Sequence, residues 1–156
     1  IFIFTADHGL TVFREQPEDL RNGYIPLVIY APSILGEPQT FEQPVSQVDI
    51  VPTLFGIIGY PDNFLAMGRD VLVNGGAFAS RITNDHMLWL EGEFLYSEIL
   101  GQSSGLVAID DFHQLGTIFI SENDSLFKEV QSRYHHYIQT AYTQFKSLGH
   151  QSGLAK

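Results

Sequence analysis

The chain has 156 residues, 44% hydrophobic and 13% aromatic, which is typical of one globular unit and excludes a disordered chain. Its formal net charge of −10, from 18 acidic and 8 basic side chains with no basic block, argues against partners such as nucleic acid or an anionic membrane surface. Cysteine is absent, which excludes disulfides and thiolate chemistry, and no apolar run reaches the roughly 18 residues that span a bilayer.

The chain opens on an unbroken apolar run, Ile1–Phe4, and then reaches Asp7, His8 and Gly9. Such a run predicts a strand buried on both faces of a parallel sheet, where ligands gather beyond the carboxyl ends of the strands. A carboxylate and an imidazole just past a strand end suit Zn²⁺ or Mn²⁺, and Gly9 eases the turn that lets both face one ion. The alternative is that Asp7 caps a loop and His8 is an ordinary polar residue.

A second buried strand is predicted in Tyr24–Pro32, because Pro26 and Pro32 bracket its apolar centre. A loop rich in Pro, Gly and Gln follows from Ser33 to Pro44. The segment Gln47–Gly59 then predicts a helix capped by Asp49, with Pro52 in its first turn and Gly59 just past its end.

Four blocks resemble, in order and spacing, the carboxyl-terminal part of the sulfatase family, in the alkaline phosphatase superfamily. Among its branches, the one with lipoteichoic acid synthase and related phosphoglycerol transferases is the most similar. The resemblance covers about residues 1–72. Its blocks are Asp7-His8-Gly9, Ile25–Pro32, Val48–Leu54 with Gly59, and Met67–Leu72.

The resemblance implies that Asp7 and His8 are ligands of a catalytic divalent metal, with Mn²⁺ or Zn²⁺ favoured and Mg²⁺ or Ca²⁺ as alternatives. It also implies that another acidic ligand and the nucleophile lie upstream: a threonine in the lipoteichoic acid synthase branch, or a modified cysteine or serine in true sulfatases. The chain lacks an initial methionine and opens inside a strand, so we expect a fragment that is inactive by itself.

The implied substrate is a phosphate or sulfate ester, lipid-linked or glycan-linked in the most specific form of the expectation. Arg14 and Arg21, in the polar stretch after the metal pair, are weak candidates for substrate binding, because their acidic neighbours favour surface ion pairs instead. The parent protein is expected on the periplasmic or extracellular face of a membrane, anchored by upstream helices. Its partners would be the missing upstream part and, through an exposed sheet edge, another copy.

Beyond residue 72 the pattern predicts a hairpin from Met87–Leu90 and Phe94–Ser97, two more short strands and a long helix. The strands are expected at Leu106–Ile109 and Thr117–Ile120. The helix should begin near Asp124 or Ser125 and stop at Gly149.

Other polar residues have simpler explanations than a metal site. Thr5 either braces the metal pair or merely finishes its strand. His135 and His136 are neighbours on a helix and diverge by about 100°, so surface or packing roles are favoured. His86 and His113 fit a strand end and a solvated turn.

The resulting prediction is an α/β fold. Residues 1–72 would form the C-terminal part of a three-layer alkaline-phosphatase-like catalytic domain, and residues 73–156 a C-terminal subdomain with antiparallel strands and a closing helix. Two alternatives stay open: a sulfatase or phosphodiesterase of the same superfamily, and a non-catalytic domain for packing or partner binding.

Overall fold

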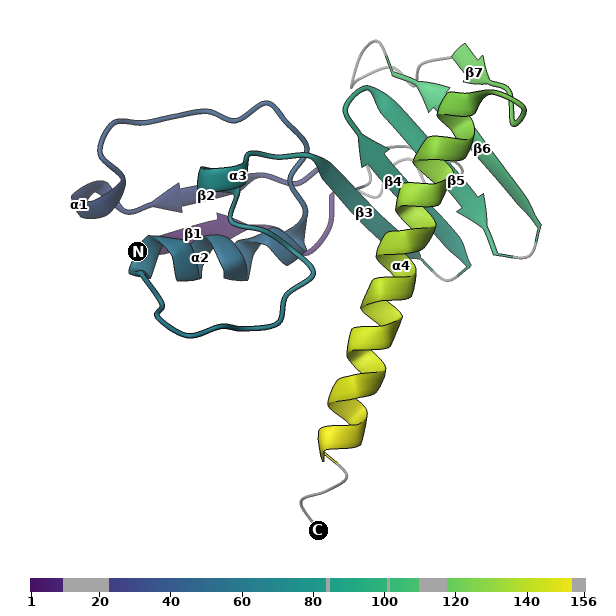
Figure 1. The fold of residues 1–156 in the computed structure, drawn as a ribbon. Coiled ribbons are helices and arrows are strands. Elements are labelled where there is room, and N and C mark those ends of the chain that lie inside the picture. The colour runs from purple at the N-terminus through teal and green to yellow at the C-terminus, as the bar shows by residue number, and fades with distance from the viewer. Residues whose placement is uncertain (10–22, 84, 101, 110–117, 153–156) are drawn as a thin grey trace. The chain divides into compact units, whose positions relative to one another are not determined.

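The computed structural model contains a two-stranded sheet, a five-stranded sheet and helices (Figure 1). Contacts divide the chain into two compact units, Ile1–Phe119 and Ile120–Lys156. The expected mixture of helix and sheet, with a small antiparallel sheet and a C-terminal helix, is confirmed. The three-layer arrangement and the division at residue 72 stay predictions. The structure describes residues 1–9, 23–83, 85–100, 102–109 and 118–152.

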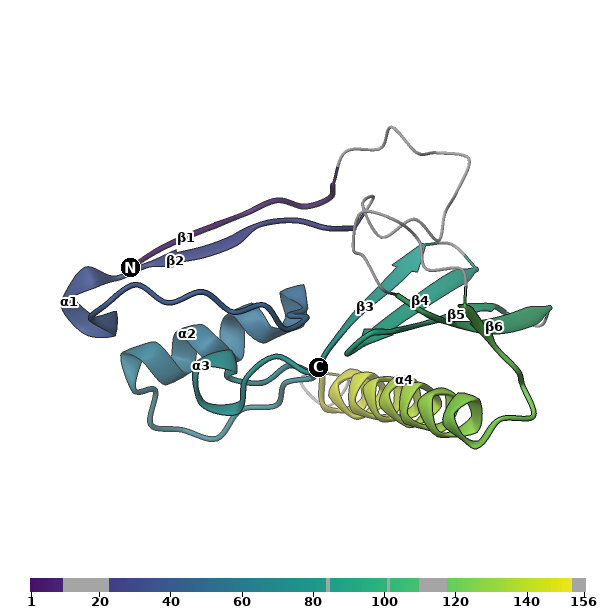
Figure 2. The ribbon, with the colours of Figure 1, turned by 90° about the horizontal axis from the view of Figure 1, so that it is seen from above.

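The first two strands, β1 (Phe2–Thr5) and β2 (Leu27–Tyr30), run side by side (Figure 2). They pair antiparallel, so the predicted parallel pairing is wrong for these described strands. The predicted burial on both faces is also wrong here, because Phe2 and Phe4 are 63% and 58% exposed. An apolar run indicates a tendency to form a strand, whereas direction and burial depend on the segments that come to lie beside it.

After β2 the chain makes the single turn α1 (Pro32–Leu35), at the start of the segment predicted as a loop. Pro32 opens this turn, where its missing N–H costs no hydrogen bond. Gly36 follows with a φ of 68°, a left-handed value that ends the turn. The sequence pattern missed α1 because one turn is too short to show a helical period.

The predicted helix forms as η2 (Gln47–Asp49) followed by α2 (Ile50–Ile58), and Gly59 ends α2 in the left-handed conformation, as expected. Asp49 occupies the predicted N-cap position of α2, but its carboxylate makes no capping bond to this helix. Instead, Asp49 and Ser46 form a capping box around η2. The Ser46 N–H donates to Asp49 Oδ2 at 2.9 Å, and the Ser46 side chain accepts from the Asp49 N–H.

Asp49 is fully buried and joins η2 to the segment before α3 (Val71–Asn74). Its Oδ1 accepts the Arg69 N–H at 2.9 Å, and the Arg69 guanidinium lies 3.7 Å from its Oδ2. The buried Thr53 hydroxyl donates to the Asp49 carbonyl at 2.7 Å and accepts the Val71 N–H at 3.1 Å. Buried polar groups are stable only when bonded in this way, so the network is the polar core of this region.

The second sheet contains β3 (Phe78–Thr83), β4 (His86–Glu91), β5 (Phe94–Ile99), β6 (Ser103–Ala108) and β7 (Ile118–Ile120), in that order. The hairpin of β4 and β5 is confirmed, with Glu91 opposite Phe94 and Gly92 at a φ of 57° in the turn. The two further strands are confirmed as β6 and β7.

Side chains alternate between the two faces of this sheet and both faces are buried at its centre. One face carries the apolar cluster of Leu88, Leu90 and Leu95 with Ile109. Trp89 lies on the opposite face, directly across from Tyr96, and both are buried.

The second unit is dominated by α4 (Ser125–Ser152), which starts where the sequence predicts. Asp124 caps it, because its Oδ1 accepts the Leu126 N–H at 2.9 Å. The predicted stop at Gly149 is wrong, since one glycine costs about 1 kcal/mol and does not by itself end a helix. In the part of the chain that the structure describes, no helix has both the length and the apolar character that crossing a membrane requires.

Candidate metal centre

Asp7, His8 and Gly9 follow directly after β1, and the structure brings the first two side chains together. Both are open to solvent, with 89% of the Asp7 side chain and 67% of the His8 side chain exposed. The His8 N–H donates to Asp7 Oδ1 at 3.0 Å, and His8 Nε2 lies 3.7 Å from the same oxygen. The carboxylate and the imidazole therefore turn toward one another at the end of the strand.

A hydrogen bond fixes which nitrogen of His8 is free to bind an ion. Nδ1 lies 2.8 Å from the Gly9 carbonyl oxygen. A carbonyl oxygen can only accept, so Nδ1 carries the proton of this bond, and in the neutral ring Nε2 has the free lone pair. Metal-binding histidines commonly hold their second nitrogen in this way, which orients the ring.

The distance within the pair can be compared with that at a zinc ion. Zinc binds imidazole nitrogen and carboxylate oxygen at about 2.0 to 2.2 Å in tetrahedral geometry, which places two ligand atoms about 3.4 Å apart. The separation of 3.7 Å between Nε2 and Oδ1 is close to this value. A hard oxygen with a borderline nitrogen suits Zn²⁺ or Mn²⁺, so the residues present fit the expected ion.

Two ligands do not complete a site. Among the described residues no group of three or more His, Asp, Glu or Cys side chains gathers where it could hold an ion. Arg14, Arg21 and His113 lie outside the described residues, so their predicted roles stay predictions.

The other expected residues do not join the pair. The Thr5 hydroxyl lies 3.5 Å from the Ala6 carbonyl and so contacts the backbone rather than the ligands, as expected for a strand end. His86 is in β4, and His135 and His136 are exposed on α4.

Gln47 also contacts this site, although no pattern in the sequence indicated it. Its Nε2 donates to the Ala6 carbonyl at 2.9 Å, immediately before Asp7. The two residues are 41 positions apart, and no local pattern relates them. Only the folded chain could reveal this contact.

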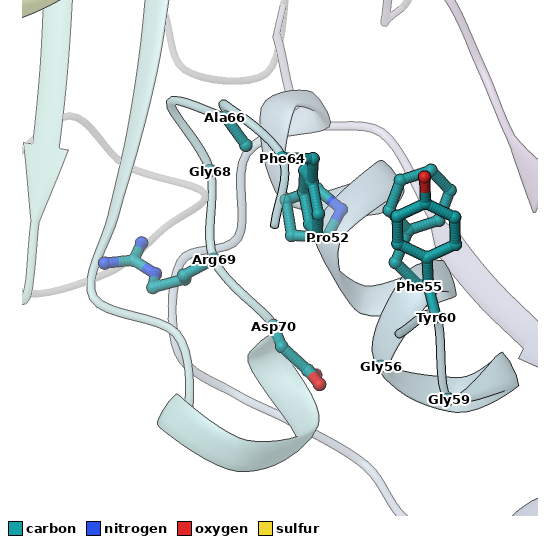
Figure 3. Close-up of a pocket in the computed structure, with 10 residues that line it drawn as sticks. All are labelled: Pro52, Phe55, Gly56, Gly59, Tyr60, Phe64, Ala66, Gly68, Arg69 and Asp70. Atoms are coloured by element: carbon teal, nitrogen blue, oxygen red, sulfur yellow. The ribbon is translucent and has the colours of Figure 1, made fainter. Parts of the chain in front are cut away.

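A separate hollow of about 420 Å³ lies between α2 and the segment that follows it (Figure 3). The rings of Phe55, Tyr60 and Phe64 pack on one another beside it, with centroids of the first two 4.4 Å apart. Asp70 points toward Gly56 and caps α3 through the Leu72 N–H.

The guanidinium of Arg69 points away from the three rings in Figure 3. The guanidinium lies 4.2 Å from the ring centroid of Phe78, and its Nη2 donates to the Phe78 carbonyl at 3.2 Å. The hollow therefore presents packed aromatic rings rather than converging charged groups, and the pair after β1 is the better candidate site.

Comparisons with protein families, curated proteins and solved structures find no match for this chain.

Proposed function

We propose that this chain is the carboxyl-terminal part of a metal-dependent enzyme that acts on phosphate or sulfate esters. The finer form of the proposal is a phosphoglycerol-transferase-like enzyme of the sulfatase family, with a three-layer alkaline-phosphatase-like catalytic domain at the outer face of a membrane. Its substrate would be lipid-linked or glycan-linked. The nucleophile and the remaining ligands would come from residues upstream of this chain.

The observation that carries the proposal is the arrangement of Asp7 and His8. Nε2 of His8 has its lone pair free because Nδ1 donates to Gly9, and it lies 3.7 Å from Oδ1 of Asp7. The exposure of both side chains leaves room for further ligands and for a substrate oxygen.

In the proposed enzyme each residue has a defined task. Asp7 supplies a charged oxygen and His8 a neutral nitrogen, while the Gly9 carbonyl keeps the imidazole in the tautomer that can bind. When bound, a divalent ion stabilises negative charge on the ester oxygens and favours the deprotonated nucleophile. The local positive charge would let an acidic protein accept an anionic substrate.

The first experiment measures Mn²⁺ binding to the 156-residue chain by the loss of the free-ion signal in electron paramagnetic resonance. The chain supplies only two ligands, so we expect weak binding by the wild type. Asp7→Ala and His8→Ala should abolish it, and Asp62→Ala, at another exposed aspartate, should leave it unchanged. Because both ligand side chains are exposed, the urea midpoint should not move in either variant. Equal binding by all four proteins would remove the pair from the proposal.

The second experiment uses the complete protein. Crystals soaked in Mn²⁺ should show an anomalous peak beside Asp7 and His8, and both alanine variants should lose turnover of a phosphodiester or a sulfate ester. The absence of an anomalous peak beside Asp7 and His8, or unchanged rates in both variants, would instead favour a packing or partner-binding domain. Identifying the nucleophile in the complete protein would separate a transferase from a sulfatase.

A further inference from the structure

Gln47 links the candidate metal loop to the buried network described above. Its side-chain Nε2 donates to the carbonyl of Ala6 at 2.9 Å. Ala6 directly precedes Asp7, so this bond acts on the peptide group that carries the first candidate ligand. Gln47 itself is exposed, and its bond reaches the backbone before Asp7 rather than the side chain of Asp7 or His8.

The backbone of Gln47 is held firmly. It is the first residue of η2, and the capping box of Ser46 and Asp49 closes around it, with both of those residues buried. The Asp49 carboxylate also accepts the Arg69 N–H at 2.9 Å. The position of its backbone is therefore set by η2, and the bond to Ala6 restrains its side chain.

A restrained Ala6 carbonyl has a direct consequence for Asp7. The peptide group between Ala6 and Asp7 is planar, so restraining its oxygen also restrains the direction of the Asp7 N–H and the position of the Asp7 Cα, from which the side chain extends. The bonds from His8 N to Asp7 Oδ1 and from His8 Nδ1 to the Gly9 carbonyl extend this order through His8.

We propose that Gln47 is a positioning residue, which holds the Ala6 carbonyl so that Asp7 and His8 stay aimed at one cation. The statement about the cation rests on the function proposed above, whereas the ordering of the loop does not. A net hydrogen bond of about 1 kcal/mol corresponds to about a fivefold change in an equilibrium constant.

The test compares the wild-type chain with Gln47→Met, which keeps the length of the side chain but removes the donor. Gln39→Met is the matched control, because Gln39 is an exposed glutamine in the loop before η2. The metal-free readout is amide hydrogen exchange of Asp7, His8 and Gly9 by NMR. The second readout is the Mn²⁺ dissociation constant.

In Gln47→Met we expect exchange of the His8 amide to accelerate about fivefold and Mn²⁺ to bind about fivefold more weakly. The unfolding free energy from urea titration should fall by no more than about 1 kcal/mol, the contribution of this one bond, which separates positioning from a general loss of stability. Gln39→Met should match the wild type in both readouts.

The possible outcomes test separately the ordering of the loop and the role of Gln47 toward the cation. Unchanged exchange at residues 7–9 in Gln47→Met would overturn the inference, whether or not Mn²⁺ binds. Faster exchange with an unchanged Mn²⁺ dissociation constant would overturn the role toward the cation. Faster exchange in a chain whose wild type binds no Mn²⁺ would support the ordering role and count against a cation role for the pair in this chain by itself.

Discussion

Replacing Asp49 by asparagine should destabilise the chain strongly, although the change adds no volume. The carboxylate is fully buried and accepts two backbone N–H groups, one from Ser46 and one from Arg69, each at 2.9 Å. An asparagine has one oxygen, so it can serve one of these donors while its NH₂ group faces the other. One buried donor is therefore left without an acceptor.

The expected cost is about 3 kcal/mol of unfolding free energy. A hydrogen bond to a charged group contributes about 1.5 to 3 kcal/mol. Loss of the negative charge also leaves the Arg69 guanidinium, 3.7 Å away and 22% exposed, without its anionic neighbour, although its contacts with Phe78 remain. Removing one member of a buried ion pair costs about 3 to 5 kcal/mol, and the partial exposure of Arg69 keeps the estimate at the lower end.

Urea unfolding followed by tryptophan fluorescence measures this cost. Trp89 is the single tryptophan, and its ring stacks on Phe78 with centroids 4.1 Å apart. Phe78 in turn contacts Arg69, so the probe is connected to the site of the change. Asp62→Asn is the control at an exposed aspartate and should lie within about 0.5 kcal/mol of the wild type. If Asp49→Asn also lay within about 0.5 kcal/mol, the reasoning about the buried acceptor would be refuted.

Two further substitutions test the same region. Gly68→Ala should lower the unfolding free energy by about 2 kcal/mol or more, because a Cβ there would overlap the Val48 carbonyl. Gly105→Ala is the control, because its Cβ would meet the nearest atom at 3.5 Å, and it should have little effect on the urea midpoint. Equal midpoints for the two alanine variants would contradict this packing argument. Thr53→Val should cost about 2 kcal/mol because the Val71 N–H loses its acceptor, and Thr53→Ser, which keeps the hydroxyl, should retain more stability in the same titration. A serine variant less stable than the valine variant would show that the methyl group matters more than the hydroxyl.

Local signals in the sequence predicted several elements correctly. The hairpin of β4 and β5 follows from two apolar segments around Glu91-Gly92-Glu93, and the start of α4 from Asp124 as a capping residue. Gly59 as the end of α2 follows from the low cost of a left-handed glycine. These signals act over a few residues and do not require the rest of the fold.

Predictions that depended on distant neighbours were less successful. The apolar residues of β1 predicted a strand correctly but a parallel partner wrongly, because pairing direction depends on which segment returns beside it. Asp49 was predicted to cap α2, whereas its carboxylate oxygens accept the backbone N–H groups of Ser46 and Arg69. Both donors belong to segments that meet Asp49 only in the folded chain.

By itself the sequence determined where most strands and helices form and that Asp7 and His8 follow a strand end side by side. Tertiary structure alone decided that Gln47 reaches Ala6 across 41 positions and that Asp49 is buried. The physical reason is range: propensities and caps act within a turn or two, whereas burial and hydrogen bonding between distant segments exist only once the chain has folded.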